Sequence, residues 1–568
     1  MTARRGADWL QGAPAFTAGV FLLPIGAGLI GTVLPAFGYL PAIGGNEFSL
    51  APWRMLIAYP GFATSVTLTL ITGVLTSVFA VILAVGFCAH AYGRPWARRI
   101  GTWLAPLLST PHSALAIGFA FLILPSGWIV RAISPWLTGW TLPPDVATVG
   151  DSSGLALVFG LLLKEVPYLI LMIVGALHQV PAREHLTIAR ALGYARAEAW
   201  LKAILPQIYP QIRLPIYAVI AFSLSVVDVG LILGPSNPPT LSVLAVRWFF
   251  DADIQMYFPA AAAACLQLVL VIATILTWFG VERIVVKVGR RWIAAGGRGG
   301  LLSWLARPTA VLTCTLFALS LLAIVGMALW SVAAQWRYPE ALPQAWTWSN
   351  WLRRADSLPA LSWTTLVIGA LATAIAVVLV LACLENESGR GKRAGAGALW
   401  ILYLPLLFPQ IAFLFGAQVL LVRLELDGTL LAVVWAHLIF VLPYLFLSLA
   451  DPWRAFDPRY ARTAASLGAS RSRVFFRVKL PILLRPLLIA CAVAFAVSVG
   501  QYLATIFAGN GRVATLTTEA VTLAGGADRR VIGAYALAQS LFPFLVYLLA
   551  LVLPALLYAN RRGLTRWT

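Results

Sequence analysis

The stretch TIARALGYARAEAWLKAILP (Thr187–Pro206) has a matching partner, RTAASLGASRSRVFFRVKLP (Arg462–Pro481), in the other half of the chain. Each stretch has Ala-rich residues before a Leu-Gly pair, and each ends on a Leu-Pro pair, so that Gly193 corresponds to Gly468. The pattern predicts a short helix, a glycine break and a second amphipathic helix that stops before the proline. Both stretches carry too many charges to cross a bilayer. We therefore expect them to lie at a membrane surface, where the first helix of each is presented to a partner.

The rest of the chain has the composition of a membrane protein. Its 568 residues are 60% hydrophobic and 11% charged, with a mean hydropathy of +0.86. A soluble protein would have about a quarter of its residues charged. Many apolar runs exceed the roughly 18 residues that a spanning helix needs. The sequence therefore predicts an all-α polytopic membrane protein.

We expect about twelve spans, six in each half of the chain. In order they are Phe16–Leu40, Phe62–Cys88, Gly101–Pro125, Leu155–Leu177, Arg213–Gly234, Tyr257–Phe279, Pro308–Val332, Leu361–Leu384, Ala398–Arg423, Thr429–Ala450, Arg485–Phe507 and Val531–Asn560.

An internal repeat relates the two sets of six spans. Thr67 matches Thr365 at an offset of 298 residues, whereas Gly193 matches Gly468 at an offset of 275. The fall in offset places extra residues of the first half near Ser126–Ser153. Both halves run in the same direction through the membrane, so the duplication is parallel and differs from an inverted repeat.

The repeat divides the chain into two equivalent domains with connecting parts. We expect an N-terminal segment with the first span (1–61), a first transmembrane domain (62–282), a cytoplasmic linker with the seventh span and an outer loop (283–360), a second transmembrane domain (361–557) and a cytoplasmic tail (558–568). The basic, glycine-containing segment Gly280–Arg307 is expected to be a hinge between the halves.

The two matched stretches resemble the EAA loop of type I ABC importer permeases, whose pattern is roughly E-A-A-x-x-x-G-x9-I-x-L-P. The leading Glu of that pattern is absent here, and Ala203 and Val478 replace its Ile. In that family the loop forms the coupling helix that docks on an ATP-binding subunit. The resemblance assigns this role to residues around Thr187, Ala189, Gly193 and Pro206 in the first half, and Arg462, Ala464, Gly468 and Pro481 in the second.

With one such loop in each half, the chain is similar to a fused pair of these permeases. The run S-V-G-Q-Y at Ser498–Tyr502 resembles the S-L-G-E-F-G-A-T stretch of fused iron(III)- and thiamine-type permeases, with Gln501 in place of Glu. The resemblance implies a permease subunit of an importer that moves a small solute of that type by alternating access. Its partners would be a dimer of ATP-binding subunits, a periplasmic solute-binding protein and membrane lipid. An ion-coupled secondary transporter or channel is the alternative, and a membrane-embedded transferase is a third reading.

The distribution of basic residues predicts the orientation in the membrane. Of the 41 Lys and Arg residues, 30 fall on the side of the two matched stretches, 10 fall on the other side, and Lys164 falls inside a span. This bias is typical of a cytoplasmic face, so the net charge of +20 does not indicate nucleic-acid binding. We expect a multi-pass protein of the bacterial inner membrane with both termini in the cytoplasm.

The sequence shows no catalytic or metal-binding pattern. A phosphate-binding loop requires G-x-x-x-x-G-K-[ST], and the run from Gly389 to Lys392 is too short for one. The five histidines and five cysteines have no metal-ligand spacing. We therefore expect no enzyme activity and no cofactor or metal in this chain, with ATP bound by a partner subunit.

Ionisable residues within spans are the candidates for a translocation pathway, because charge at bilayer depth is costly. Lys164 and Glu165 lie midway along the fourth span, and Asp228 lies in the fifth. One interpretation is an internal ion pair of Lys164 with Asp228 or Glu165; the other is a polar lining of the pathway. The second half has Phe440, Val441 and Gln501 at these positions. We hypothesise that the first half contributes charged contacts, and the second contributes His437 and Gln501.

Overall fold

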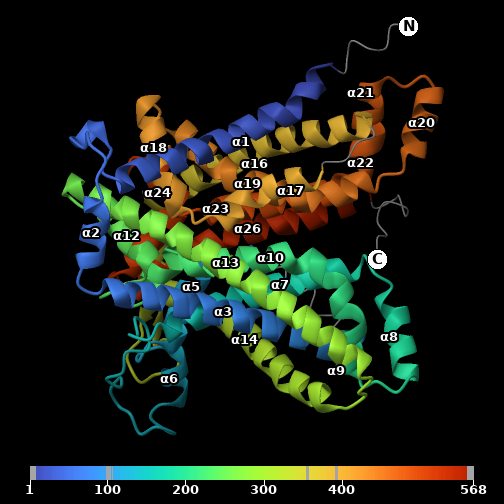
Figure 1. Cartoon of the computed structure of the whole chain (residues 1–568). Helices are drawn as coiled ribbons and strands as arrows, with labels where there is room; N and C mark the ends of the chain where they lie inside the picture. The colour runs from blue at the N-terminus through green and yellow to red at the C-terminus, as the bar shows by residue number, and fades with distance from the viewer. Residues whose placement is uncertain (1–7, 97–103, 105–106, 353–356, 391–394, 559–568) are drawn as a thin grey trace.

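The fold is built almost entirely from helices; the long helices lie roughly along one common axis, and several short helices at its ends lie across that axis (Figure 1). The computed structural model describes residues 8–96, 104, 107–352, 357–390 and 395–558. The start of the third expected span and the expected tail after residue 558 lie largely or wholly outside these residues. In the described part, one antiparallel pair of strands, β1 (Ala333–Gln335) and β2 (Ala345–Trp346), is the only sheet.

The first half of the chain contains the following elements: α1 (Asp8–Ala36), η1 (Pro41–Ile43), α2 (Ala51–Ala58), α3 (Phe62–Ala91), α5 (His112–Ile123), α6 (Trp128–Ile133), α7 (Leu155–Leu177), α8 (Ala182–Ala191), α9 (Arg196–Ala199), the π-helical turn η3 (Trp200–Ile204), α10 (Leu205–Ser225), α11 (Asp228–Leu233), α12 (Leu241–Phe249), η4 (Ile254–Met256) and α13 (Tyr257–Ala294).

The second half contains these helices: α14 (Leu301–Ser331), α15 (Ser349–Leu352), α16 (Ser357–Arg390), α17 (Ala396–Leu407), α18 (Ile411–Arg423), α19 (Leu430–Arg454), α20 (Pro458–Ser466), α21 (Arg471–Val474), the π-helical turn η5 (Phe475–Lys479), α22 (Leu480–Ile482), α23 (Leu484–Val499), α24 (Leu503–Gly509), α25 (Leu516–Ala524) and α26 (Arg529–Leu557).

The number of long apolar helices confirms a polytopic membrane protein. Within the described residues, nine helices are long and apolar enough to cross a membrane, and two bent pairs raise the number to as many as eleven. The pairs α17–α18 and α21/α22–α23 bend by 97° and 75°. Helix α10, in the fifth expected span, is not among the nine, since its first half carries prolines, glutamines and Arg213.

Within the described residues, four expected spans are broken rather than continuous. Gly101–Pro125 breaks at Thr110 and Pro111, just before α5. Arg213–Gly234 breaks between α10 and α11, Arg485–Phe507 breaks between α23 and α24, and Ala398–Arg423 breaks between α17 and α18. The last of these breaks contains Pro409, which lacks the N–H that a continuing helix would donate. Hydropathy alone did not predict these breaks, because each lies within a long and predominantly apolar stretch.

Side chains from other helices bind the carbonyl groups that such interruptions free. In the first half, Gln267 Nε2 of α13 donates to the Leu224 oxygen at 3.0 Å, where a continuing helix would have supplied the N–H of residue 228. In the second half, the Thr517 hydroxyl donates to the Val499 oxygen, and Gln539 Nε2 of α26 supports that hydroxyl at 2.8 Å. These two breaks are therefore each held by a glutamine of the last helix in their half, directly or through Thr517.

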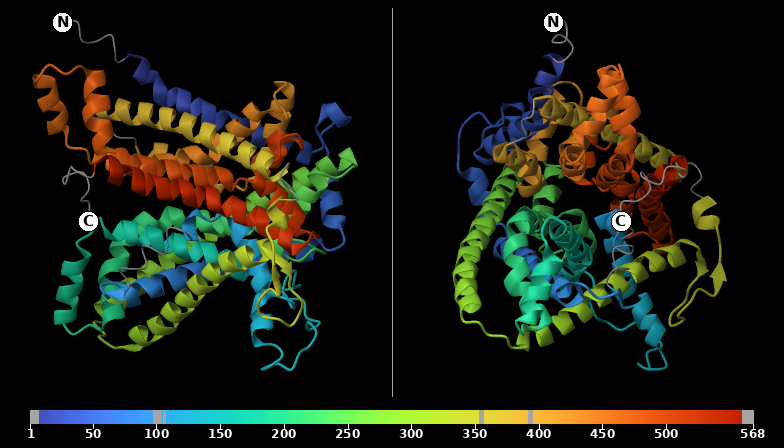
Figure 2. Two further views of the ribbon diagram at one scale, coloured as in Figure 1. Left: turned by 180° about the vertical axis from the view of Figure 1, so that it is seen from behind. Right: turned by 90° about the vertical axis from the view of Figure 1, so that its right-hand side faces the viewer.

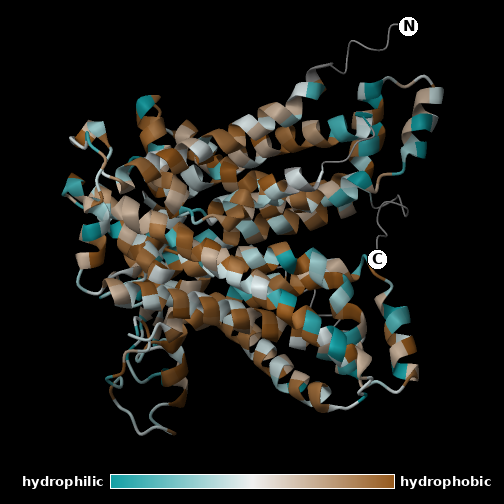
Figure 3. Cartoon of the chain, in the orientation of Figure 1, coloured by the Kyte–Doolittle hydropathy of each residue, from teal (hydrophilic) through white to brown (hydrophobic). Residues whose placement is uncertain are grey.

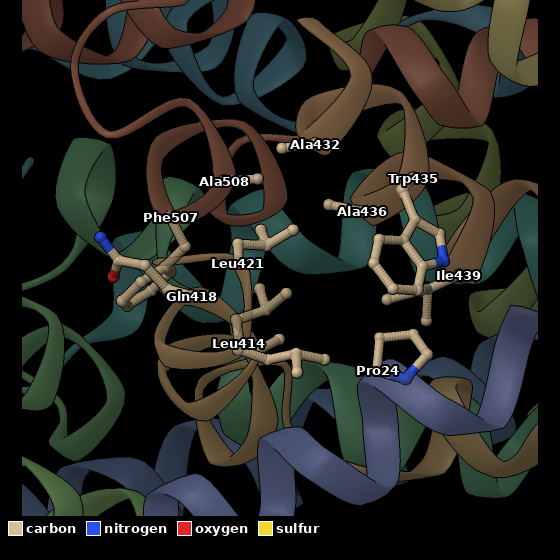
Figure 4. Close-up of a pocket in the computed structure, with 12 residues that line it drawn as sticks. Pro24, Leu414, Gln418, Leu421, Ala432, Trp435, Ala436, Ile439, Phe507 and Ala508 are labelled. Carbon is tan, nitrogen blue, oxygen red and sulfur yellow. The ribbon is translucent and has the colours of Figure 1, made fainter. Parts of the chain in front are cut away.

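A carbonyl group that a proline inside a helix leaves free is also bound by a side chain of another helix. Pro24 of α1 leaves the Val20 oxygen without its usual donor, and the indole Nε1 of Trp435 donates to that oxygen at 2.9 Å. Figure 4 shows Trp435 beside Pro24 at the edge of a small apolar hollow of about 20 Å³. This hollow is about the size of a single water molecule, so it is a packing feature between α1 and the second half.

The first helix of each half packs on the other half. Helix α1 lies along α18 and α16, whereas α14 lies along α3 and α5. Both crossings are made close by glycine: a Cβ on Gly31 would stand 2.8 Å from the Cα of Gly416, and a Cβ on Gly118 would stand 2.6 Å from the Ala323 oxygen. Gly118 and Gly416 are a matched pair of the sequence repeat. Helices α1 and α14 therefore cross the opposite half at equivalent positions.

Equivalent contacts also correct the repeat alignment in α3. The N–H of Leu241 donates to the Thr69 hydroxyl at 2.9 Å, and the N–H of Leu516 donates to the Thr365 hydroxyl at 3.0 Å. Leu241 and Leu516 are themselves matched at an offset of 275. Thr69, and not Thr67, is thus the structural counterpart of Thr365. The hydrogen bond is equivalent in the two halves, and it identifies the matching position better than the local Thr-Leu sequence does.

The predicted hinge between the halves is mostly helical. Helix α13 continues to Ala294 and α14 begins at Leu301, so only residues 295–300 of Gly280–Arg307 lie outside a helix. The charged residues of this segment extend α13 beyond its apolar part. The extra outer residues of the first half form α6 and a loop, and Arg131 Nη1 there donates to the Arg337 oxygen near the β-hairpin at 2.9 Å.

We predict that alanine at the α1–α18 crossing destabilises the protein, whereas alanine two residues away, on another face of α1, does not. A Cβ on Gly28 would overlap the Phe413 carbonyl, but a Cβ on Gly26 meets nothing within 4 Å. Gly28→Ala should cost about 1–3 kcal/mol, and Gly26→Ala should be neutral or stabilise by up to about 1 kcal/mol. Thermal unfolding of the detergent-solubilised protein measures both. Equal melting temperatures for the two variants would contradict the close crossing.

Candidate functional site

The first of the two matched loops begins with helix α8, which ends in a glycine turn. Gly193 has a φ of +87°, a left-handed value that favours glycine. The N–H of Tyr194 donates to the Ala189 oxygen at 3.2 Å, and the N–H of Gly193 donates to the Arg190 oxygen at 3.0 Å. This pair of hydrogen bonds is the Schellman motif, which closes the carbonyl end of a helix. Gly193 therefore sets the angle at which α8 leaves the bundle.

The second loop repeats this geometry. Gly468 has a φ of +82°. The N–H of Ala469 donates to the Ala464 oxygen, and the N–H of Gly468 donates to the Ala465 oxygen, both at 3.0 Å. The glycine break that the sequence predicted is thus present in both loops with the same hydrogen bonds.

The proline that follows each glycine begins a helical segment instead of ending one. In the first loop the chain passes from α9 through η3 directly into α10, with Pro206 in the first turn of α10. In the second loop it passes from α21 through η5 into α22, with Pro481 at the equivalent place. Proline is tolerated there because the first N–H groups of a helix have no partner. The expected stop before proline is therefore wrong, and a π-helical turn precedes each proline.

Both loops project from the same end of the bundle. Figures 1 and 2 show α8 and the α20–α21 pair at one end, with the spans running away from them. The same end is rich in hydrophilic residues in Figure 3. No residue of α20 is buried, and only Ala182 and Ala189 of α8 are buried.

Large apolar side chains are nevertheless exposed on these two loops. Ile188 and Leu192 are 60% and 54% exposed in the first loop, and Tyr460 and Leu467 are 57% and 83% exposed in the second. A hollow with a volume of about 370 Å³ also lies beside α8. Its lining includes Ile188, Leu192 and Ile293 of α13. Exposed apolar residues on a polar projection are typical of a protein interaction surface.

The other motif residues of the loops have different environments. Thr187 is exposed, and its hydroxyl donates to the Arg183 oxygen at 2.8 Å, so it serves its own helix. Arg462 is exposed on α20, and Ala464 is half-buried there. Both loops thus present basic and apolar side chains, whereas the family pattern begins with a glutamate.

Lys164 lies in the interior and contacts backbone carbonyl groups. Its ammonium donates to the oxygens of Leu107 at 3.1 Å, Leu108 at 2.7 Å and Thr110. Residues 107–109 are the end of a helical turn that stops just before α5, and a cation is favourable at such a carbonyl end. Among the described residues, no ion pair within 4 Å joins Lys164 to Asp228 or Glu165, although the adjacent Glu165 charge acts on it.

Glu165 and Asp228 belong to a polar cluster between the two halves. His112 Nε2, at the start of α5, lies 3.4 Å from the carboxylate of Glu165, whose side chain is 6% exposed. The charge of Asp228 lies within electrostatic range of His112 and Tyr502, and that of Glu165 lies within range of Tyr444. Tyr444 and Tyr502 come from the second half, so the cluster spans the interface. The His112 side chain is one third exposed.

His437 and Gln501 occupy different places in the second half. His437 is 2% exposed, and its ring nitrogens bind the hydroxyls of Ser498 at 2.8 Å and Thr505 at 2.9 Å. It therefore links α19 to α23 and α24, with both nitrogens engaged. Gln501 lies in the break between α23 and α24, where its Nε2 donates to the Val497 oxygen at 3.2 Å and its Oε1 is buried without a hydrogen-bond partner.

Sequence reasoning did not select His112, Gln267 or Gln539. The two glutamines lie at an offset of 272, close to the repeat offset of this region, and that coincidence was the available signal. His112 follows a proline at the start of a helix, which carries no signal of its own. Within the described residues, no group of three or more His, Cys, Asp or Glu side chains is arranged to hold a metal ion.

Comparison with known proteins finds relatives that are permeases by name. No protein-family model matches the chain. The chain is 32% identical over 516 residues to the inner membrane ABC transporter permease protein YnjC of Escherichia coli (strain K12), covering 91% of this chain and 93% of YnjC. It is 36% identical over 130 residues to the molybdenum transport system permease protein ModB of Mycobacterium tuberculosis, covering 21% of this chain and 49% of ModB. It is 24% identical over 166 residues to the spermidine/putrescine transport system permease protein PotC of Haemophilus influenzae, covering 29% of this chain and 63% of PotC.

We predict that Lys164 and Asp228 act independently on stability. Lys164→Met should leave carbonyl groups at the helix end unbound, at a cost of about 1–3 kcal/mol. Adding Asp228→Asn should change stability by the same amount with or without Lys164, within about 0.5 kcal/mol. A double-mutant cycle on thermal unfolding measures this. A double variant markedly more stable than the sum of the single effects would show that the two side chains pair.

Proposed function

The chain belongs to the inner-membrane permeases of ABC transporters, and from this premise we propose that it is the translocating subunit of an ATP-driven, binding-protein-dependent importer. It spans the membrane many times and carries two transmembrane domains in one chain. Hydrolysis of ATP would take place on a separate dimer of nucleotide-binding subunits. This chain would convert that hydrolysis into movement of a solute.

The pair of matched loops is the observation that supports this proposal best. Helices α8 and α20 project from one end of the bundle, end in the same glycine turn and expose apolar side chains. Two equivalent projections suit a dimeric partner with two equivalent grooves. The residues that would couple to it lie around Thr187, Ala189, Gly193 and Pro206, and around Arg462, Ala464, Gly468 and Pro481.

Transport would proceed by a switch between two packed states. When the two nucleotide-binding subunits close on ATP, the docked loops would approach each other and the interface between the halves would open to the outside. The polar cluster of His112, Glu165 and Asp228 lies at that interface and would face the solute. Gln501 would contribute from the second half, and His437 would act there by holding α19 against α23 and α24.

The solute would be small and of the iron(III), thiamine or similar type. Support for this comes from the Ser498–Tyr502 run and its likeness to that group of fused permeases. The names of the relatives specify molybdenum for ModB and spermidine/putrescine for PotC. A periplasmic binding protein would deliver the solute, and mass spectrometry of the ligand that this partner retains on purification would identify it.

We also propose that the loops and both termini face the cytoplasm. Support comes from the 30 of 41 basic residues that fall on the side of the loops. A binding protein would then meet the opposite, outer end.

We predict that an ATP-binding protein copurifies with this chain and that acidic substitutions on the loops weaken the association. Leu192→Asp and Leu467→Asp place a charge on residues that are 54% and 83% exposed, so the fold should be unaffected. Each should weaken binding at least tenfold, or about 1.4 kcal/mol, if the residue is central to the interface. Affinity purification with quantitative mass spectrometry measures the ratio of the two proteins.

Leu142→Asp is the matched control, because Leu142 is 76% exposed but lies in the outer loop after α6. It should leave the ATPase association unchanged. If no ATPase copurifies with the unaltered chain, and a proton or sodium gradient alone drives uptake, the protein is an ion-coupled transporter and the proposal is wrong.

A further inference from the structure

The short connection between the halves is fastened to the first coupling loop. Lys202, in η3, donates from Nζ to the Trp292 oxygen at 3.3 Å and to the Gly297 oxygen at 2.8 Å. Its ammonium also lies 4.4 Å from the ring centre of Trp292 and 5.2 Å from that of Tyr194. The Trp292 carbonyl belongs to the last turn of α13, where a cation is favourable. One side chain thus binds the end of α13 and the turn that follows it.

A second contact fastens the same loop to the start of α14. Glu198 is 3% exposed. Its carboxylate accepts the Ser303 N–H at 3.1 Å and the Ser303 hydroxyl, and that hydroxyl oxygen accepts the Ala197 N–H at 3.1 Å. The first N–H groups of a helix have no partner within it, and an anion is favourable there. A buried carboxylate at this position is stable because the helix start supplies its donors.

Among the residues that the structure describes, the second coupling loop has no equivalent attachment. At the offset of 275 that relates Gly193 to Gly468, the counterparts of Glu198 and Lys202 are Arg473 and Arg477, and both are exposed. That loop is instead attached through Lys479, which forms an ion pair with Glu385 of α16. It is therefore fixed to a helix of its own half, whereas the first loop is fixed to the helix that opens the other half.

Helix α14 makes this difference mechanically relevant. It has 31 residues, which corresponds to a length of about 46 Å at the usual rise. It starts on the first coupling loop and packs along α3 and α5 of the first half and α26 of the second. A displacement of its start is therefore passed to both halves.

We propose that Glu198 and Lys202 are positioning residues that clamp the connection between the halves onto the first coupling loop, so that α14 follows the stroke of that loop. The clamp makes the fused chain asymmetric: the first loop drives helices of both halves, and the second loop drives its own half. This inference rests on the proposed function, because the stroke is supplied by the ATP-binding partner.

Spin labels on the full chain in lipid nanodiscs test the clamp. With the five native cysteines replaced, one label is placed at Ala191, at the end of α8, and one at Leu301, at the start of α14; both residues are exposed. In the complex with the ATPase, the distance between them should stay constant when ATP and vanadate are added. In the Glu198→Gln/Lys202→Gln variant it should shift by roughly 5 Å, about one helical turn.

Two controls separate clamping from a general effect on stability. Lys202→Arg keeps the positive charge, so the distance between the two labels should stay constant, as in the unaltered chain. Arg477→Gln changes the matched position of the second loop and should also leave this distance constant. A distance that stays constant in the Glu198→Gln/Lys202→Gln variant while nucleotide moves the loops overturns the clamp and leaves the proposed function intact.

The chain without a partner supplies an independent readout. There the clamp predicts a narrow distance distribution for the unaltered chain and a broad one for the Glu198→Gln/Lys202→Gln variant, and equal widths overturn it. If no ATPase binds at all, the proposed function fails, but this comparison still decides the clamp.

Discussion

The structure depends on one constraint: a backbone carbonyl freed inside the membrane must find a donor within the protein, because lipid offers none. Broken helices and internal prolines free several such groups here. Lys164 binds three carbonyls at the helix end before α5, Gln267 binds the Leu224 oxygen, the Thr517 hydroxyl binds the Val499 oxygen, and Trp435 binds the Val20 oxygen. Each donor comes from a different helix, so the interruptions are also the places where helices are joined. The bundle can therefore contain irregular backbone at its centre and remain packed.

This constraint explains why polar residues at membrane depth serve two different purposes. Lys164 and His437 are engaged by the protein itself, the first by carbonyls and the second by two hydroxyls. Glu165 and Asp228 instead join His112 and the tyrosines of the second half at the interface. The halves also differ, since Lys164 corresponds to Phe440 and the two coupling loops are attached to different helices. The duplication preserved the architecture and allowed its polar contacts to diverge.

Much of the fold could be predicted from sequence, because the signals were local or repeated. Gly193 and Gly468 were recognisable as the ends of short helices, since a glycine at equal spacing from a Leu-Pro pair occurs in both halves. The breaks after Ser225 and Val499 were not predictable, because both lie within long apolar runs and the donors that stabilise the breaks come from distant helices. For the same reason the sequence indicated an ion pair for Lys164, whereas its partners are carbonyl groups that no residue letter reveals. The hinge predicted at Gly280–Arg307 stays a prediction, and the helical extent of this segment was not predictable, because charge and glycine are common both in loops and at exposed helix ends.

The central claim is that the two matched loops lie at the cytoplasmic face and transmit the conformational change of a separate ATPase to the transmembrane helices. Its most direct test is the sidedness of single cysteines at Leu192 and Leu467, in a chain without its native cysteines, towards a membrane-impermeant maleimide. The account predicts that both are labelled in inside-out vesicles and that neither is labelled in right-side-out vesicles. Labelling of either position from the outside, or of the two from opposite sides, would contradict it.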